Sequence, residues 1–293
     1  MDANQDTPLR QAYRLHGRHW RDNAYCYPVV SRRSGGLSIG INLNPDTACN
    51  FDCVYCQVDR STPPAVRKVD LGRLRAELDH LLDVACDGSL FATSPFDALA
   101  ADRRQVCDIA FSGDGEPTTY PRFDEAVRIA VEAKAARGLK QTKIILITDA
   151  CYLTKPRVVA GLGLMDKNNG EIWAKLDAGT EEYFQVVNRP SHSLSHVLAN
   201  IRQTAMIRPI VIQSMWMKVH GRPPPEAELH AFASHLGDII AAGGGIKLVQ
   251  VYTIARQTAE AYATALANSE LDHVAGVVRE SIELPIETFY GSS

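Results

Sequence analysis

Apolar stretches of strand length alternate with amphipathic helical stretches along most of this chain. Six strand-like stretches lie at 37–43, 106–112, 142–148, 171–178, 209–217 and 246–254. Several are near-continuous apolar runs, which are typical of parallel strands covered on both faces. Helices are predicted where apolar residues recur at three- and four-residue spacing, at 71–85, 123–136, 192–205 and 226–242. Strand-then-helix units in series predict an α/β fold with a parallel sheet and right-handed crossovers.

Six such strands are fewer than the eight that close a TIM barrel. We therefore expect a partial (β/α)6 TIM-like barrel, although an open doubly wound sheet has the same local signature. Residues 1–36 differ in character, since they carry six arginines, and we expect them to form a helix and loop as an N-terminal extension. Residues 37–293 are expected to form one core domain.

The charge balance argues against a generally nucleic-acid-binding or membrane-binding surface. Lys plus Arg number 31 against 34 for Asp plus Glu, so the formal net charge is −3. This balance leaves room for a local basic patch. The first ten residues lack an apolar signal region, and runs such as 144–147 are too short to span a bilayer. The seven cysteines argue for reduced thiols in a cytoplasm, and we expect a cytoplasmic protein with no membrane partner.

Three cysteines follow directly on the first predicted strand, at Cys49, Cys53 and Cys56. They are expected on a loop at its carboxyl end, where barrel enzymes build their sites. Three interpretations compete. The spacing fits a stripe on a buried helix, part of a zinc site that lacks its fourth ligand, or an iron–sulfur cluster with one open iron. The other four cysteines are scattered singly, so no fourth ligand is evident, and we favour the cluster.

The second predicted strand ends in the glycine-rich segment FSGDGEPT (111–118). Glycines let the backbone approach a ligand closely. The alternative is a simple turn between strand and helix, because Gly, Asp and Pro all favour turns.

Polar residues also occur where later strands end. Thr148 and Asp149 close the third strand, while Lys175 and Asp177 share one face of the fourth. Charged residues inside an apolar strand are costly unless they are paired or used. The alternative is that Lys175 and Asp177 pair with each other or lie at an exposed end. Gln213 and Ser214 lie similarly within the fifth apolar run.

The C-x3-C-x2-C pattern with Tyr55 before its last cysteine resembles the signature of the radical SAM superfamily. That resemblance implies a [4Fe–4S] cluster at the three cysteines, whose open iron chelates S-adenosylmethionine (SAM). It also implies reductive cleavage of SAM to a 5′-deoxyadenosyl radical, which abstracts hydrogen from a substrate. An external electron donor of the flavodoxin or ferredoxin type is then an expected partner.

The resemblance also implies cofactor contacts at the other strand ends. Residues 113–117 resemble the superfamily's glycine-rich element at the methionine end of SAM, with Asp114 where a second glycine is common. The implied contacts are Tyr55 near the adenine, Gly113, Gly115 and Glu116 at the methionine end, and Thr148, Asp149, Lys175 and Asp177 at the ribose and carboxylate.

Residues 28–256 resemble one branch of the superfamily, which contains the enzymes that form the tricyclic wyosine precursor on tRNA. The strongest matches include KLDAGTEEYFQVVNRP and VYTIAR. This branch implies tRNA or another RNA base as substrate. However, only Cys26 precedes the motif, so this chain lacks the N-terminal cysteines of a second cluster. A peptide or small metabolite as substrate, and a non-catalytic iron–sulfur or zinc protein that binds RNA, remain alternatives.

Other polar residues receive simpler interpretations. His192 and His196 are spaced i, i+4 and are interpreted as a solvated pair rather than a metal site. The arginines at 10–21 are interpreted as a solvated helix face, with RNA contact as the alternative. Arg32–Arg33, close ahead of the first predicted strand, are placed to meet an anionic substrate. Tyr252 and Arg256 lie at the end of the sixth predicted strand and would face the same mouth of a barrel.

Overall fold

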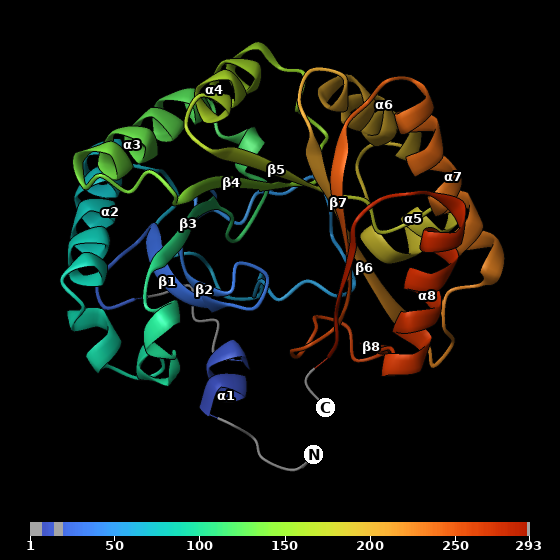
Figure 1. Cartoon of the computed structure of the whole chain (residues 1–293), viewed down its shortest axis with the longest axis horizontal. Helices are drawn as coiled ribbons and strands as arrows, with labels where there is room; N and C mark the ends of the chain where they lie inside the picture. The colour runs from blue at the N-terminus through green and yellow to red at the C-terminus, as the bar shows by residue number, and fades with distance from the viewer. Residues whose placement is uncertain (1–7, 15–19, 292–293) are drawn as a thin grey trace. The chain divides into compact units, whose positions relative to one another are not determined.

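The computed structural model describes residues 8–14 and 20–291 of the chain. The chain divides into two compact units, each built from three separate segments. The first unit comprises Met1–Asp46, Pro64–Leu146 and Ala160–Gly170, and the second Thr47–Pro63, Ile147–Val159 and Glu171–Ser293. Both units combine strands with flanking helices (Figure 1).

The first unit contains four strands with their helices. Its strands are β1 (Cys26–Ser31), β2 (Gly36–Ile41), β3 (Val106–Phe111) and most of β4 (Lys143–Thr148). Its helices are α1 (Pro8–Arg14), α2 (Leu71–Cys86), α3 (Phe123–Ala136) and most of α4 (Pro156–Asp166), with short 3-10 turns at η1 (Ser89–Ala92), η2 (Phe96–Ala98), η3 (Ala101–Arg103) and η4 (Pro117–Thr119). Strands β2, β3 and β4 run parallel, while β1 joins the outer edge of β2 in the antiparallel sense.

The parallel strands of this unit are covered on both faces. Every residue of β2 is buried, and α2 packs against β1, β2, β3 and α3. Figure 1 shows α2 and α3 on the same side of these strands. Burying a large aliphatic or aromatic side chain stabilises a fold by about 1.5–3 kcal/mol. The near-continuous apolar runs therefore supply this core.

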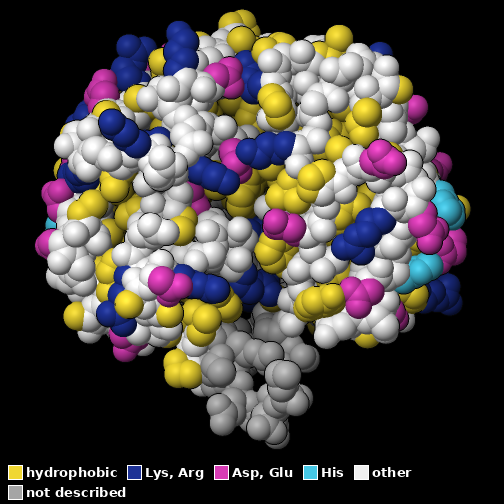
Figure 2. All heavy atoms as spheres, in the orientation of Figure 1, with side chains coloured by type: hydrophobic (Ala, Val, Ile, Leu, Met, Phe, Trp, Pro, Cys, Tyr) yellow, Lys and Arg dark blue, Asp and Glu magenta, His cyan; other side chains and the backbone are white. Residues whose placement is uncertain are grey.

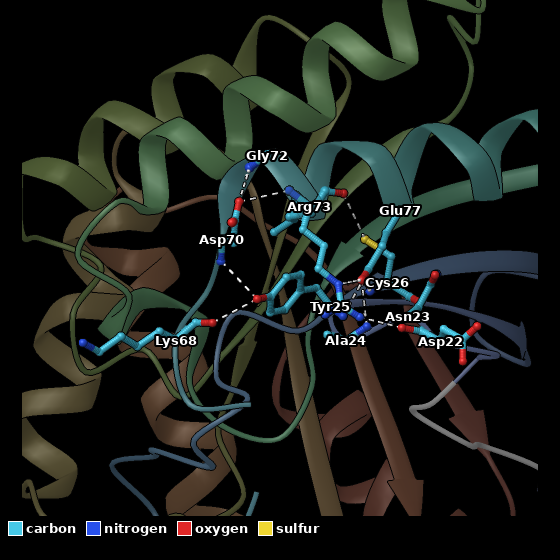
Figure 3. A network of polar contacts seen from close by, with 11 residues as sticks. Asp22, Asn23, Ala24, Tyr25, Cys26, Lys68, Asp70, Gly72, Arg73 and Glu77 are labelled. Atoms are coloured by element: carbon cyan, nitrogen blue, oxygen red, sulfur yellow. Dashed lines mark hydrogen bonds and ion pairs between the residues drawn. The ribbon is translucent and has the colours of Figure 1, made fainter. Parts of the chain in front are cut away.

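The entry into β1 is fixed by one buried carboxylate, that of Glu77 on α2 (Figure 3). It accepts hydrogen bonds from the backbone nitrogens of Ala24 (2.8 Å), Tyr25 (2.8 Å) and Cys26 (3.1 Å). The Nε of Arg73, one turn earlier on α2, donates to the same carboxylate at 2.7 Å. The Glu77 side chain thus joins the helix to the start of the edge strand, and the sulfur of Cys26 adds a contact to the carbonyl oxygen of Leu74 at 3.7 Å.

The second unit contains the remaining elements. Its strands are most of β5 (Gly170–Lys175), β6 (Ile210–Val219), β7 (Ile246–Thr253), β8 (Ala263–Ala265) and β9 (Ile286–Phe289). Its helices are α5 (Glu181–Asn188), α6 (Leu194–Ala205), α7 (Glu226–Ala241) and α8 (Asn268–Ser281). Strands β5, β6, β7 and β9 run parallel in that order, and β8 pairs antiparallel with the end of β6.

Local chemistry explains where α5 and α6 begin. The hydroxyls of Thr180 and Ser193 accept hydrogen bonds from backbone nitrogens of the first turns, as N-caps do. Gly179 precedes the first of these caps because α7 passes too close for a side chain. A Cβ there would lie 2.3 Å from the backbone nitrogen of Phe232.

All six predicted strands and all four predicted helices are present, with ends that differ from the prediction by a few residues at most. The expectation of a helix and loop before residue 37 is wrong at residues 26–31, which form the strand β1. Four further elements of the second unit were not predicted: α5, β8, α8 and β9. The division into an extension at 1–36 and a core at 37–293 remains a proposal.

Charged side chains of both signs are interspersed over the face drawn in Figure 2. This distribution agrees with the near balance of charge in the sequence. Within the described ranges, none of the helices combines the length and apolar character needed to cross a membrane.

We expect Glu77→Gln to lower the free energy of unfolding by about 3 kcal/mol. An amide offers one acceptor oxygen where the carboxylate offers two, so buried backbone donors at the start of β1 lose their partners. Urea denaturation followed by circular dichroism measures the loss. Glu132→Gln is the control, since Glu132 pairs with Arg75 in an exposed ion pair between α3 and α2 and is expected to cost less than about 1 kcal/mol. Equal losses in the two variants would contradict the role given to Glu77.

Candidate metal centre

The three clustered cysteines lie on an irregular loop of the second unit. Residues 49–56 contain no helix, and the backbone nitrogen of Cys56 donates to the carbonyl oxygen of Cys53 at 2.9 Å. Cys49 is exposed, Cys56 is half-buried, and Cys53 is only 7% exposed. The interpretation as a stripe on a buried helix is therefore wrong.

Backbone hydrogen bonds hold this cysteine loop, residues 49–56, on two sides. On one side, the nitrogens of Asp52 and Val54 donate to the carbonyl oxygens of Asn188 (3.0 Å) and Val187 (2.9 Å) at the end of α5. On the other side, the carbonyl oxygens of Val54 and Cys56 accept from residues 260 (3.2 Å) and 259 (2.9 Å). The loop is thus fixed between two segments that are distant in the sequence.

Arg189 connects the same two sides through its guanidinium. It contacts the carboxylates of Asp52 on the cysteine loop (3.3 Å) and Glu260 (2.8 Å), and it donates to the hydroxyl of Tyr262 at 2.5 Å. These neighbours raise the pKa of Arg189, with the hydrogen bond to Glu260 as the largest cause. The residue adopts a left-handed conformation, φ 45°, directly after α5.

Asp177 follows β5 and lies behind the cysteine loop, 1% exposed. Its carboxylate accepts hydrogen bonds from the hydroxyl of Tyr55, from the side-chain nitrogen of Asn188 (2.8 Å) and from the backbone nitrogen of Met215 (2.8 Å). Burial raises the pKa of Asp177, while the hydrogen bond from Tyr55 and the charge of Lys175 oppose that shift. Burial also raises the pKa of Tyr55 well above its usual range, so the hydroxyl stays protonated and acts as the donor in its hydrogen bond to Asp177.

Lys175, two residues earlier on β5, supplies positive charge to this region. Burial alone lowers its pKa, but charge interactions with nearby groups outweigh burial and raise it overall. In order of size, these groups are Cys53, Tyr252, Asp177 and Cys49. Burial raises the pKa of the Cys53 thiol to about 12, with Lys175 acting in the opposite direction. Lys175 therefore lies close enough to Cys53 and Cys49 for their charges to interact.

Thr148 and Asp149 are both buried in the second unit. Asp149 accepts hydrogen bonds from the side chain of Asn50 on the cysteine loop and from the backbone nitrogen of Cys151, both at 2.9 Å. Burial raises its pKa. The hydroxyl of Thr148 accepts from the backbone nitrogen of Ala150 at 3.0 Å. The structure thus brings Asp149 and Asp177 to the cysteine loop, where they contact Asn50 and Tyr55.

The glycine-rich turn with Gly113, Gly115 and Glu116 belongs to the first unit. A Cβ on Gly113 would lie 2.5 Å from the side-chain oxygen of Asn42, so only glycine fits there. Asn42 also donates to the carboxylate of Asp114 at 2.6 Å. Glu116 is 3% exposed and caps the turn η4, because it accepts from the backbone nitrogen (3.0 Å) and the hydroxyl (2.5 Å) of Thr118.

The donor set of the cysteine loop suits a cluster better than a single ion. Among residues 8–14 and 20–291, no three His, Cys, Asp or Glu side chains surround one possible metal position. Structural zinc takes four ligands around one ion, and this loop offers three thiols. In a cubane each cysteine binds a different iron, so its thiolates stand farther apart, and three of them leave one iron open. The loop offers three thiols, which are the type and number of donors that such a cluster takes.

The sequence profile of the Radical SAM superfamily matches residues 43–219, which is more than half of the chain. The chain belongs to the radical SAM superfamily. Members of this superfamily are enzymes that use a [4Fe–4S] cluster and SAM. The cofactors expected from the cysteine pattern are those of this family.

Several curated proteins resemble this radical SAM chain over part of their length. A protein described as GTPase Obg from Brachyspira hyodysenteriae is 23% identical over 250 residues, which cover 84% of this chain and 32% of that protein. The UPF0026 protein MJ1312 of Methanocaldococcus jannaschii is 26% identical over 167 residues, 57% of this chain and 44% of that protein. The UPF0026 protein slr1464 of Synechocystis is 29% identical over 168 residues, 56% of this chain and 51% of that protein. This chain spans about a third to a half of the length of these relatives.

Solved structures of spore photoproduct lyase variants share the fold. One variant has a TM-score of 0.56 and 10% identity, over 93% of this chain and 81% of that protein. A second, solved with a dinucleoside spore photoproduct, has a TM-score of 0.56 and 11% identity, over 99% of this chain and 87% of that protein. Together with the family match, this likeness confirms the expected α/β fold of the radical SAM type, a partial TIM-like barrel.

Sequence reasoning missed Asn42, which holds the glycine-rich turn of the first unit. In the second unit it missed three residues that hold the cysteine loop: Asn50, Asn188 and Arg189. Asn188 and Arg189 lie inside the segment KLDAGTEEYFQVVNRP, whose resemblance to the wyosine-forming branch could have indicated that they contribute to the site.

The remaining polar residues have local partners. The rings of His192 and His196 stack at 4.9 Å, and a ring nitrogen of His196 lies 3.0 Å from the carbonyl oxygen of Cys151. Arg256 donates to the side chain of Gln57 at 3.4 Å, which places it beside the cysteine loop. The side chains of Arg10, Arg14 and Arg18 lie outside the described residues, so RNA contact there remains untested.

We expect Asp177→Asn to lower the free energy of unfolding by about 3 kcal/mol, because it breaks a buried network of charged and polar groups. The amide presents hydrogen atoms toward groups that themselves donate, so at least one of the three donors loses its acceptor. Thermal and urea denaturation of the protein without added iron measure the effect. Glu182→Gln on the exposed surface of α5 serves as the control and should leave the unfolding midpoint unchanged. An Asp177→Asn variant as stable as the original protein would rule out this role.

Proposed function

We propose that this radical SAM enzyme holds one [4Fe–4S] cluster through Cys49, Cys53 and Cys56. The observation that carries the proposal is the cysteine loop, which is fixed on both sides and places a buried thiol near Lys175. These three residues would hold the cluster, and the chemistry that it would supply is the one-electron reductive cleavage of SAM, with the electron coming from the external reductant. The protein supplies ligation, orientation and exclusion of water.

The chain's own residues have separate tasks in this proposal. Lys175 stabilises the thiolates that ligate iron and offers a cation to the carboxylate of SAM. Tyr55 and Asp177 lock the cysteine loop against the end of β5. Thr148 and Asp149 offer polar groups to the ribose. Gly113, Gly115 and Glu116 serve the methionine end, where the close approach of the backbone at Gly113 suits a small ligand group.

For the substrate, we propose a nucleic acid base, with tRNA as the leading candidate. Two observations support this choice: the resemblance of residues 28–256 to the wyosine-forming branch, and the shared fold with a lyase solved with a dinucleoside. The second candidate class is a peptide or small metabolite. An external reductant of the flavodoxin or ferredoxin type and a cytoplasmic location complete the proposal. Membership of an enzyme family disfavours the alternative of a non-catalytic binding module.

We expect the purified protein to take up about four irons after anaerobic reconstitution. Each of the variants Cys49→Ala, Cys53→Ala and Cys56→Ala is expected to lose most of this iron, because three thiolates are the minimum that holds the cubane. Iron analysis and the electron paramagnetic resonance (EPR) signal of the reduced protein measure the loss. Cys86→Ala, at the exposed end of α2, is the matched control and should keep its iron. Iron retained in all three loop variants would end the proposal.

Reduced protein is expected to convert SAM to 5′-deoxyadenosine. The Cys53→Ala variant is expected to convert no more SAM than the original protein does when reductant is omitted. Chromatography with mass detection measures the product.

The substrate class is tested with deuterium-labelled RNA from a strain that lacks the gene. Transfer of deuterium from that RNA into 5′-deoxyadenosine supports a nucleic acid substrate. Transfer only from the small-molecule or peptide fraction would instead select the second class.

A further inference from the structure

Asn188 is the last residue of α5 and is fully buried behind the cysteine loop. Its side-chain nitrogen donates to the sulfur of Cys53 at 3.4 Å and to the carboxylate of Asp177 at 2.8 Å. Its backbone oxygen accepts from the nitrogen of Asp52 on the same loop at 3.0 Å. One residue thus reaches the loop with both its main chain and its side chain.

The carboxylate of Asp177 determines which way this amide points. A carboxylate oxygen only accepts, so the nitrogen and not the oxygen of the Asn188 amide must face it. Asp177 is itself held by the hydroxyl of Tyr55 and the backbone nitrogen of Met215. The second hydrogen of the amide is therefore directed at Cys53, and rotation of the amide would place two oxygens against each other.

Water is poorly placed to substitute for this donor. Cys53 is 7% exposed, whereas Cys49 is exposed to solvent. A sulfur that loses a protein donor in such a buried position has no ready replacement. Hydrogen bonds to the sulfurs are among the factors that set the reduction potential of an iron–sulfur cluster.

We propose that Asn188 is a positioning residue that donates a hydrogen bond to the Cys53 sulfur of the loaded enzyme and raises the midpoint potential of its cluster. This inference rests on the proposed function, since it takes Cys53 as a ligand. One-electron reduction adds negative charge to the cluster and its sulfurs. A fixed donor stabilises that reduced form more than the oxidised form, so the electron is accepted more readily.

The test compares Asn188→Ala with Asn200→Ala after anaerobic reconstitution. Asn200 is a matched control, because it is a buried asparagine of the same unit, 5% exposed, whose amide donates to the carbonyl oxygens of Ala150 (3.0 Å) and Cys151 (2.8 Å). Redox titration without SAM, followed by EPR, gives the midpoint potential. Asn188→Ala is expected to shift it to a more negative value, while Asn200→Ala leaves it unchanged.

An unchanged potential in Asn188→Ala, or an equal shift in both variants, would overturn the inference. If Asn188→Ala does not take up iron, the original protein decides the question. Its asparagine side chains are labelled with nitrogen-15, and pulsed EPR of the reduced cluster is recorded. A weak nitrogen-15 coupling supports the hydrogen bond, and its absence overturns the proposal. Failure of the original protein to bind iron would instead remove the proposed function, and this inference with it.

Discussion

The buried carboxylate of Asp177 is the constraint on which the arrangement of the metal centre depends. A carboxylate is costly to remove from water unless hydrogen-bond donors replace its hydration. Its donors come from three segments that are far apart in the sequence: Tyr55 on the cysteine loop, Asn188 at the end of α5 and Met215 on β6. Satisfying this one group therefore fixes the loop, the helix end and two neighbouring strands together. The position of Cys53 follows, because Asn188 and Tyr55 flank it.

Burial and the nearby cation of Lys175 act in opposite directions on the ionisation of Cys53. In the ligand-free protein burial opposes ionisation of Cys53, and its pKa rises to about 12. Iron binding requires deprotonated thiols, so metal uptake releases protons and must offset this cost. The same cysteines raise the pKa of Lys175, so Lys175 keeps its positive charge. This charge reduces the cost of forming the thiolates. The side chain of Asn188 acts in the same direction through its hydrogen bond to the sulfur.

The sequence predicted those parts of the fold whose signal is local. Several of the strands β2 to β7 are near-continuous apolar runs, and α2, α3, α6 and α7 carry clear helical periodicity. Three of the missed elements lack such signals: β9 is half-exposed along its length, β8 has three residues, and α5 has only eight. β1 contains Pro28, which belongs on an edge strand, and that is where the structure places it. At the site, Asp177 could be predicted from the sequence because a charged residue within an apolar run is unusual. Asn188 and Arg189 could not, because their roles arise only when the end of α5 meets the cysteine loop.

Attachment of the loop at both flanks also bears on how it can take up a cofactor. Ordering a flexible segment costs about 1–2 kcal/mol per residue in backbone entropy. The cysteine loop forms backbone hydrogen bonds to α5 and to residues 259–260, and Arg189 joins Asp52 to Glu260. These interactions offset the entropy loss when the chain folds, before any metal binds. The glycine-rich turn of the first unit is likewise organised by its own partners, Asn42 and Thr118. Each element is therefore held in place by the protein alone, so little of the free energy of cofactor binding is needed to order it.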